Sequence, residues 1–453
     1  MPVKKGQKYD MVIERLGSNG EGIAHVSGFT VFVEGALPGE AIKAEVTTVK
    51  KNYAAAKVLD WNNTSSDRVE PKCPIYDKCG GCNLQHISYE AQLDFKRRQV
   101  IDAIVHIGGL KDIFVEKTIA AKNPWNYRNK MQFPVGNKNG IIEIGCFARG
   151  THDIITTDEC FIQDEVNNKI MQAMHEAINK YHVPVYDEDS HKGILRHVVG
   201  RVTLKGEAMV TLVTAKNDLP RAKEIGLFLR KKVPSVISIQ QNIQTYHNNV
   251  IMGRETKVLW GKQTIMDKIG TLEFHVSPRS FFQVNTEQAE ILYDKVREFI
   301  SLTGNETVID AYCGTGTIAL YLARHARKVY GIEIVSPAIS DAKKNARDNN
   351  IKNAEFIVGD ATKIIPRLYK EGIRADAVVV DPPRAGCTVE VLQAFAAMKP
   401  GRIVYVSCNP ATLARDMAIL DKIGYKAEKV QPVDMFPQTS HVETVSLILP
   451  KML

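Results

Sequence analysis

The chain has 453 residues, so at about 150 residues per domain we expect about three domains. Hydrophobic residues make up 44% and charged residues 24% of the sequence, which excludes collagen-like, low-complexity and wholly disordered proteins. The net charge of +8 permits a nucleic-acid partner but does not require one. Because no apolar window is long enough to span a bilayer and no secretory signal opens the chain, we expect a cytoplasmic protein without a membrane partner.

The first predicted element is a small antiparallel β-barrel over about residues 9–60. Short alternating runs, such as 28–33 and 41–46, are separated by turn signals that include Gly35 and Gly39. Barrels of this size often bind single-stranded nucleic acid, and a purely structural role is the alternative. The polar stretch 62–67 is predicted to be the linker that follows the barrel.

Three clustered cysteines come next, at Cys73, Cys79 and Cys82, and Cys160 lies much further along the chain. Clustered cysteines in a reducing compartment more often hold metal or do chemistry than form disulfides. Four thiolates are enough for a tetrahedral zinc or for an iron-sulfur cluster, and the spacing alone favours zinc.

A helix is predicted after Ser88, which is a favourable N-cap, and Gly108 ends it. From about Trp125 to Val276, strands alternate with helices without a recognisable motif, which indicates a second domain of unassigned purpose. We interpret Cys146 and Cys387 as ordinary packing residues, and Cys313 has no assigned role. The apolar face of the predicted helix consists of Leu93, Val100, Ile101, Ile104 and Val105.

After about Gln283 the pattern becomes strand, loop, helix and strand again. This alternation predicts a doubly wound, parallel α/β sheet, which binds ligands at the carboxyl ends of its strands. The predicted strands are Thr307–Ala311, Val329–Ile334, Ala354–Val358, Ala377–Val380 and Arg402–Val406.

A glycine loop at 310–317 lies between a predicted strand and a predicted helix, where a ligand can approach the backbone. The loop also fits a dinucleotide fingerprint, because Ala319 stands where a third glycine or alanine is accepted. Glu333 ends the next strand and is placed to accept hydrogen bonds from ribose hydroxyls. Asp360 ends the following strand, where it can bind an adenine amino group. Together these residues indicate an adenosine-containing cofactor.

Chemistry is predicted at the ends of the last two parallel strands. Cys408 lies just past an apolar run among polar neighbours, which favours an accessible thiol over a core cysteine. A polar stretch at 433–443 precedes the final apolar strand, and Glu443 or His441 in it could serve as a base.

Three segments carry a resemblance to a known family: DPPRAG (381–386), YVSCN (405–409) and DMFPQTSHVE (434–443). They resemble the signatures of RNA uracil-5-methyltransferases, which use S-adenosylmethionine. The resemblance implies that Cys408 is the nucleophile and Glu443 the base. It also implies a set of residues around the cofactor, namely Gln283, Tyr312, Thr317, Glu333, Asp360 and Asp381.

The resemblance extends over nearly the whole chain and implies three domains. Residues 1–60 resemble a TRAM barrel, which is OB-like, and 61–275 form a central α+β domain for RNA binding. Residues 276–453 form a Rossmann-like methyltransferase domain, and the helix near 88–107 is expected to pack on it. The cysteines are similar to a [4Fe-4S] site, which reverses the preference for zinc. The implied ligands are Cys73, Cys79, Cys82 and Cys160.

The barrel and the cysteines together favour 23S rRNA as the substrate, because the resemblance implies that tRNA members of the family lack both. We expect a monomer whose partner is RNA. A tRNA uridine C5-methyltransferase is the alternative within the family. An RNA-binding protein with a relict catalytic domain is a different class, but Cys408 and Glu443 are both present. A cytosine C5-methyltransferase also uses a cysteine, yet it would not need the segment 436–443.

Overall fold

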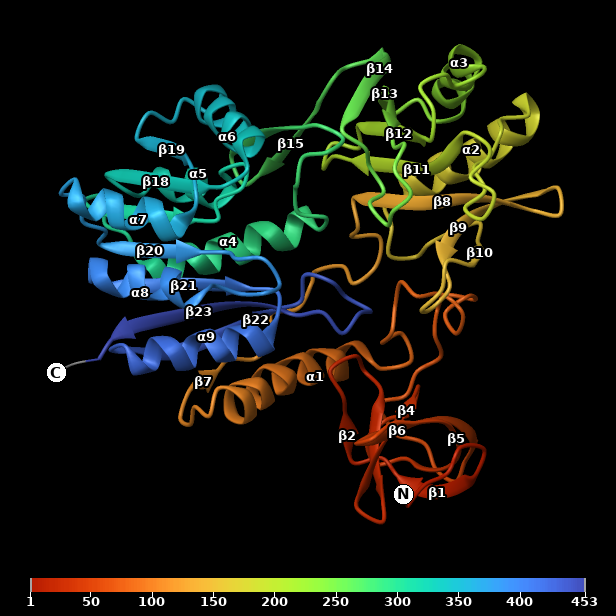
Figure 1. Cartoon of the computed structure of the whole chain (residues 1–453), viewed down its shortest axis with the longest axis horizontal. Helices are drawn as coiled ribbons and strands as arrows, with labels where there is room; N and C mark the ends of the chain where they lie inside the picture. Colours follow the sequence, from red (N-terminus) through yellow and green to blue (C-terminus); the bar gives the residue numbers. More distant parts are fainter. Residues whose placement is uncertain (1, 452–453) are drawn as a thin grey trace.

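The computed structural model describes residues 2–451, in which a small barrel, a central sheet and a large C-terminal sheet follow one another along the chain (Figure 1). The barrel and the central sheet lie on the right in Figure 1, and the C-terminal sheet lies on the left. Among the described residues, no helix is both long and apolar enough to cross a membrane.

The barrel has the strand order β1-β5-β6-β4-β3-β2. Its core is made of small and β-branched side chains that face inward, such as Val31, Val33 and Ile42. The prediction of purely antiparallel pairing was wrong in one place. Strands β4 and β6 pair in parallel, because β6 forms an antiparallel hairpin with β5 and meets β4 with its other edge. The strands are β1 (Lys8–Val12), β2 (Arg15–Leu16), β3 (Gly22–Val26), β4 (Phe29–Glu34), β5 (Ala41–Val49) and β6 (Tyr53–Trp61).

Helix α1 (Tyr89–Asp102) begins after Ser88, whose hydroxyl accepts a hydrogen bond from the Ala91 amide, as predicted. A π-helical turn, η1 (Ala103–Ile107), continues it and ends at Gly108. The predicted apolar face was partly wrong, because Val105 is exposed while Gln92 and Lys96 are fully buried. These polar side chains are buried because they contact a segment near the C-terminus that includes Asp434 and Gln438.

The central sheet has seven strands in the order β10-β9-β8-β11-β12-β13-β14. The apolar sides of α2 and α3 pack on it through residues such as Ile170, Met174 and Leu229. Its elements are β8 (Lys130–Lys138), β9 (Ile141–Phe147), β10 (Ile154–Thr156), α2 (Glu165–Tyr181), β11 (Leu195–Val202), β12 (Ala208–Thr214), α3 (Ala222–Lys232), β13 (Val236–Ile243) and β14 (Glu255–Gly261).

The C-terminal sheet has eight strands in the order β19-β18-β17-β20-β21-β23-β22-β7. All five predicted strands are confirmed, and they form the parallel part, β17 to β21. Helices cover both faces (Figure 1). The strands are β7 (Phe114–Val115), β17 (Thr307–Ala311), β18 (Lys328–Glu333), β19 (Ala354–Val358), β20 (Ala377–Val380), β21 (Arg402–Ser407), β22 (Tyr425–Val433) and β23 (Glu443–Pro450). The helices are α4 (Thr286–Ile300), α5 (Thr317–Ala323), α6 (Ser336–Asp348), α7 (Ala361–Lys370), α8 (Val389–Met398) and α9 (Pro410–Lys422), and the hairpin β15 (Ile265–Ile269) and β16 (Leu272–Val276) packs beside α4.

The register between β21 and β23 decides what meets at the carboxyl edge of this sheet. The final strand β23 runs antiparallel to β21, and Ser407 pairs with Thr444. Cys408 follows Ser407 and Glu443 precedes Thr444, so the two residues come next to each other at the end of the same ladder. The sheet therefore brings together two side chains that are far apart in the sequence.

Candidate active site

The predicted cofactor residues Tyr312, Thr317, Glu333 and Asp360 all lie at the carboxyl edge of the parallel strands. Glu333 accepts hydrogen bonds from the amides of Gly314 at 3.3 Å and Val335 at 2.8 Å. Asp360 caps α7, and its bonds from the Thr362 side chain and amide hold its pKa below the usual range. Both acids are thereby fixed at the mouth of the site.

The glycine loop is wound tightly but leaves open space on one side. Tyr312 has φ +63°, which is strained for a residue with a side chain, and Gly316 has φ +81°. A Cβ on Gly316 would lie 2.8 Å from the Phe356 ring, so only glycine fits there. A Cβ on Gly314 would meet nothing within 4 Å, so the loop is open above this residue. Such a loop can cradle a ligand against its backbone.

Asp310 is the unsatisfied polar group of this region. It is 1% exposed, and neither carboxylate oxygen has a hydrogen-bond partner. Burial raises its pKa well above the usual range, and the neighbouring Asp381 adds to that effect. A buried carboxyl group without a partner is costly, so its place at the cofactor edge fits a ligand with donors or positive charge. An adenosine cofactor with a sulfonium group meets this description.

The remaining two predicted cofactor residues are Gln283 and Asp381. Both lie near Tyr293, which also contacts Thr317. The Tyr293 hydroxyl donates to the Thr317 hydroxyl at 3.2 Å, and Gln283 is within hydrogen-bonding reach of the same ring. Asp381 raises the pKa of Tyr293, although burial contributes more. The sequence analysis missed Tyr293, because an aromatic residue inside an amphipathic helix looks like ordinary core.

Cys408 and Glu443 lie side by side, and the carboxyl group of Asp381 is close to both. Burial, Glu443 and Asp381 raise the pKa of the half-buried Cys408 thiol to about 11. Burial also raises the pKa of Glu443 well above its usual range, and Asp381 adds to the shift. Arg384 opposes both shifts and is a site residue that the sequence analysis left without a role. The Cys408 thiol therefore holds its proton at neutral pH, and the Glu443 carboxyl group holds its proton to a higher pH than an exposed glutamate does.

The segment that leads into Glu443, residues 434–442, is here called the strap. Lys96 and Asp434 form an ion pair with an Nζ to Oδ1 distance of 2.5 Å, and both side chains are 0% exposed. The Tyr89 hydroxyl donates to the other oxygen of Asp434 at 2.9 Å. Gln92 exchanges hydrogen bonds with Gln438. The strap is thus held by α1, which explains the buried polar face of that helix.

The four cysteines predicted as ligands gather in one place. Cys73, Cys82 and Cys160 pack together in a buried cluster, and Cys79 joins them closely enough to raise the pKa of Cys82. Burial is the main reason why the pKa of Cys82 reaches about 12. Within residues 2–451, however, no three His, Cys, Asp or Glu side chains are arranged to hold a single metal ion.

The interpretation of Cys146 as a packing residue was incomplete. Its thiol is within hydrogen-bonding reach of both Cys79 and Cys160, and the bond lowers the pKa of Cys79 to about 6. Strand β9 brings it there, since Ala148 forms a backbone bridge with Cys79 and Cys146 lies two residues earlier on the same side. A fifth thiol therefore stands beside the four predicted ligands.

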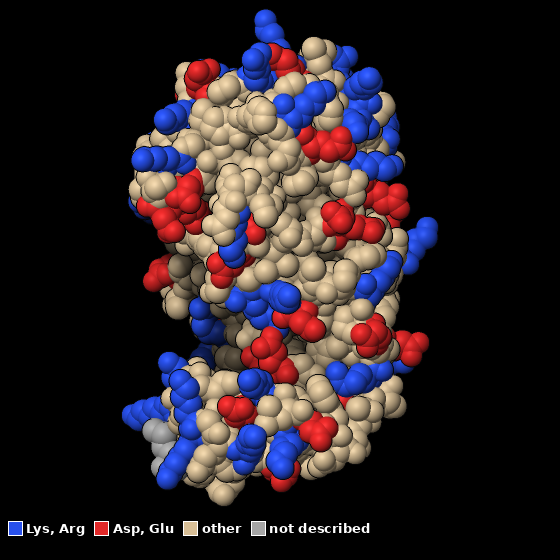
Figure 2. Space-filling model, turned by 90° about the vertical axis from the view of Figure 1, so that its right-hand side faces the viewer, with Lys and Arg blue, Asp and Glu red and all other residues tan. Residues whose placement is uncertain are grey.

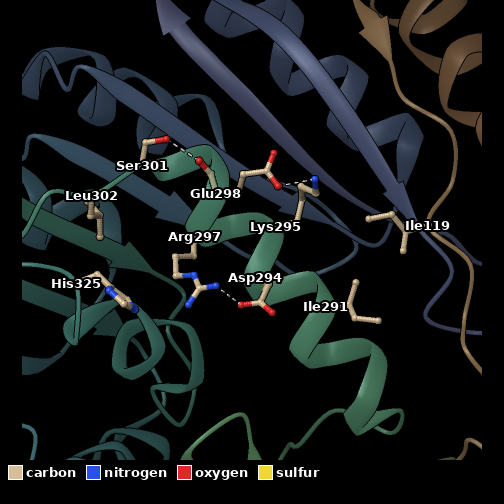
Figure 3. A pocket seen from close by; sticks show the side chains of 9 residues that line it. All are labelled: Ile119, Ile291, Asp294, Lys295, Arg297, Glu298, Ser301, Leu302 and His325. Carbon is tan, nitrogen blue, oxygen red and sulfur yellow. Dashed lines mark hydrogen bonds and ion pairs between the residues drawn. The ribbon is translucent and has the colours of Figure 1, made fainter.

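Two other surfaces of the molecule lack the features of the candidate site. A cavity of 630 Å³ lies along α4 (Figure 3), but its charged side chains pair with one another, Lys295 with Glu298 and Arg297 with Asp294. Figure 2 shows the face that carries the barrel and the central sheet, on which Lys and Arg side chains alternate with Asp and Glu. Surface charge on this face therefore does not single out one patch for an anionic partner.

Comparison with known proteins gives concordant matches over almost the whole chain. The family model of tRNA (uracil-5-)-methyltransferases matches residues 88–451, and that of the TRAM domain matches residues 2–59. A protein of Clostridium tetani that is named as an RNA methyltransferase is 50% identical over 449 residues, which are 99% of this chain and 97% of that protein. One from Listeria innocua, also named as an RNA methyltransferase, is 48% identical and covers 98% of each.

One solved structure is similar over its full length. It is a tRNA (uracil-54, C5)-methyltransferase of Pyrococcus abyssi in complex with S-adenosyl-L-homocysteine. The TM-score is 0.78 and the identity 30%, and the match covers 97% of this chain and 99% of that one. The similarity includes the barrel region, so the domain layout alone does not separate rRNA from tRNA enzymes.

Proposed function

The chain belongs to the tRNA (uracil-5-)-methyltransferase family, and on that premise we propose that it methylates C5 of a specific uridine in 23S rRNA, giving 5-methyluridine. One observation carries the proposed mechanism. The register of β21 and β23 places Cys408 beside Glu443, at the same sheet edge as the cofactor residues. The proposal includes a monomer that acts in the cytoplasm.

The reaction needs a nucleophile because C5 of uracil is a weak one. The Cys408 thiolate forms a bond to C6, and the electron pair of the C5–C6 double bond moves towards the C4 carbonyl to give an enolate. When bound, S-adenosylmethionine supplies an electrophilic methyl group and a positive sulfonium charge. C5 of the adduct takes the methyl group, and the electrons of the broken carbon–sulfur bond stay on the cofactor sulfur. A stacked uridine cannot reach Cys408, so the target must first turn out of the RNA.

Glu443 completes the reaction in this proposal. The methylated adduct still carries a proton on C5, and the Glu443 carboxylate removes it. The C5–C6 double bond then forms again and the Cys408 thiolate leaves. Because the pKa of both groups is raised in the free protein, both need nearby positive charge to lose their protons. Arg384 provides it, since it lowers the pKa of each.

The choice of 23S rRNA rests on the cysteine segment, because the matched tRNA enzyme of Pyrococcus abyssi also aligns over the barrel region. A tRNA uridine is the second candidate, because the Pyrococcus abyssi enzyme whose name specifies tRNA matches this chain over 97% of its length. Mapping 5-methyluridine in total RNA from cells with and without the gene distinguishes the two. Loss of one 23S position on deletion, restored by the wild-type gene but not by Cys408→Ala, is the expected result. Loss in tRNA instead would select the second candidate, and loss in neither would contradict both.

We further propose that Cys73, Cys79, Cys82 and Cys160 hold a [4Fe-4S] cluster. Support comes from the gathering of these cysteines in one buried place. Protein purified without oxygen should contain about four irons per chain. Cys160→Ser should lose the iron, and Cys146→Ser, the matched control, should keep it. One zinc and no iron would contradict the proposal, and the reverse pattern of the two variants would make Cys146 the ligand.

A further inference from the structure

Asn83 directly follows Cys82 and connects three separate parts of the chain. Its side-chain amide group donates to the Ser440 hydroxyl at 3.0 Å and to the backbone oxygen of Asn19 at 2.5 Å. Its side-chain oxygen accepts a hydrogen bond from the Ser440 amide at 2.8 Å. The barrel, the cysteine segment and the strap therefore meet at one side chain.

The backbone at this point adds to the contact with the strap. The amides of Asn83 and Leu84 both donate to the Gln438 carbonyl, each at 3.1 Å. Gln438 has φ +69°, a conformation that costs energy for a residue with a side chain and persists only where its surroundings hold it. Residues 83–84 are thus part of what keeps the strap in this shape.

The barrel contributes the opposite side of the contact. The loop that contains Gly20 packs so closely on Leu84 that a Cβ on Gly20 would lie 2.5 Å from a methyl carbon of Leu84. The Gln99 side chain of α1 donates to the Ser18 carbonyl at 2.7 Å in the same loop. The barrel loop therefore contacts residues 83–84 and α1 directly.

The strap itself leads straight to the proposed base. Ser440 precedes Glu443 by three residues, and the connection between β22 and β23 extends towards the segment that precedes α1 (Figure 1). Groups that act in catalysis must be held within a fraction of an ångström by the residues around them. Asn83 makes no contact with Cys408 or Glu443 among its hydrogen bonds, so any effect on catalysis passes through the strap.

We propose that Asn83 is a positioning residue, which holds the strap so that Glu443 reaches the C5 proton of the adduct, and which couples this position to the barrel. The inference rests on the proposed function. It predicts a specific defect, because the strap leads into the base, whereas the nucleophile follows β21. Loss of Asn83 should slow the release of the adduct while leaving its formation by Cys408 nearly unchanged.

Single-turnover assays with labelled S-adenosylmethionine and RNA test this, because they measure adduct formation and adduct release separately. For Asn83→Ala we expect release to slow by at least about tenfold, since a displacement of about 1 Å can cost as much as 10²-fold. Asn83→Asp keeps the acceptor for the Ser440 amide but cannot donate, so it should restore part of the rate. Asn63→Ala is the matched control, because the Asn63 side chain bonds only to Ala41 and Gly39 at the barrel.

A second measurement does not depend on catalysis. In hydrogen exchange on the full-length protein, Asn83→Ala should remove protection from the strap amides, above all that of Ser440, while the glycine loop stays protected. Unchanged exchange at Ser440, or release at the wild-type rate, would overturn the proposal. A proportional fall in adduct formation and release would also overturn it, because that result indicates general destabilisation. Failure of the wild-type protein to form any adduct would instead contradict the proposed function.

Discussion

The two walls of the candidate site are built in different ways. One wall is the carboxyl edge of β17 to β21, where predicted site residues such as Tyr312, Asp381 and Cys408 follow directly on a strand that positions them. The other wall is the strap, which has little regular structure and is held by side chains from residues 83–127. The first wall is specified by local sequence, whereas the second depends on partners hundreds of residues away. Changes to the first wall should therefore act on single chemical steps, and changes to the second should also act on stability.

The largest expected effect tests the sheet wall. Cys408→Ala should bind RNA and S-adenosylmethionine normally but lose methyl transfer by a factor on the order of 10⁴ or more, because no thiolate can add to C6. A denaturing gel with labelled methyl groups should show no protein–RNA band. A covalent band from this variant would exclude Cys408 as the nucleophile.

A variant of Glu443, the residue into which the strap leads, should give the opposite result on the same gel. Glu443→Gln should still transfer the methyl group and then stall, so that turnover falls by about 10²- to 10⁴-fold and a covalent band accumulates. Because the pKa of Glu443 is raised, the wild-type release rate should increase with pH as the carboxyl group loses its proton, and the variant should lose this dependence. Free methylated RNA at the normal rate would reassign the base, with His441 the next candidate.

The anchoring of the strap is tested by its buried ion pair. Lys96→Met leaves the Asp434 carboxylate buried without its charged partner, which should lower the free energy of unfolding by about 3–5 kcal/mol. Urea denaturation measures this, and the double variant Lys96→Met/Asp434→Leu is the control that should recover most of the loss. If the single variant is as stable as the wild type, the strap does not depend on this distant partner for its stability.

The smallest effect concerns the charge next to the nucleophile. With a pKa of about 11, Cys408 is a thiol at neutral pH, so its alkylation rate should rise roughly tenfold per pH unit up to that pKa. Arg384→Gln should raise the pKa further and slow alkylation a few-fold, because an exposed charge acts through solvent. Peptide mass spectrometry follows Cys408 separately from the other cysteines. Equal rates in the variant would remove Arg384 from the site.

The same contrast explains what the sequence could predict. The strands at 307–311, 354–358 and 377–380 were predicted at their observed ends, because β-branched runs and the loops after them are local signals. Glu333 and Asp360 were predicted from the ends of such strands, whereas the other four cofactor residues were implied only by the family resemblance. A local pattern is sufficient wherever a residue's position is set by the strand before it.

Long-range partners left no such signal. Lys96 was not among the residues predicted for the buried face of its helix, because its partner Asp434 lies 338 residues later. Cys146 looked like a packing residue because the strand that carries it meets the cysteine segment only in the folded chain. Pairwise contacts of this kind depend on the tertiary fold, so one sequence without relatives cannot reveal them.

The register that joins Cys408 to Glu443 also determines where the chain can change in length. Helix α9, strand β22 and the strap all lie between the two residues, yet the distance between them is set by the ladder of β21 and β23. An insertion after Lys422 would lengthen a surface turn and leave the pair intact. Loss of one residue early in β23 would turn Glu443 to the opposite face of the sheet. If the pair acts as proposed, activity should therefore tolerate added residues after Lys422 but not the deletion of a single residue early in β23.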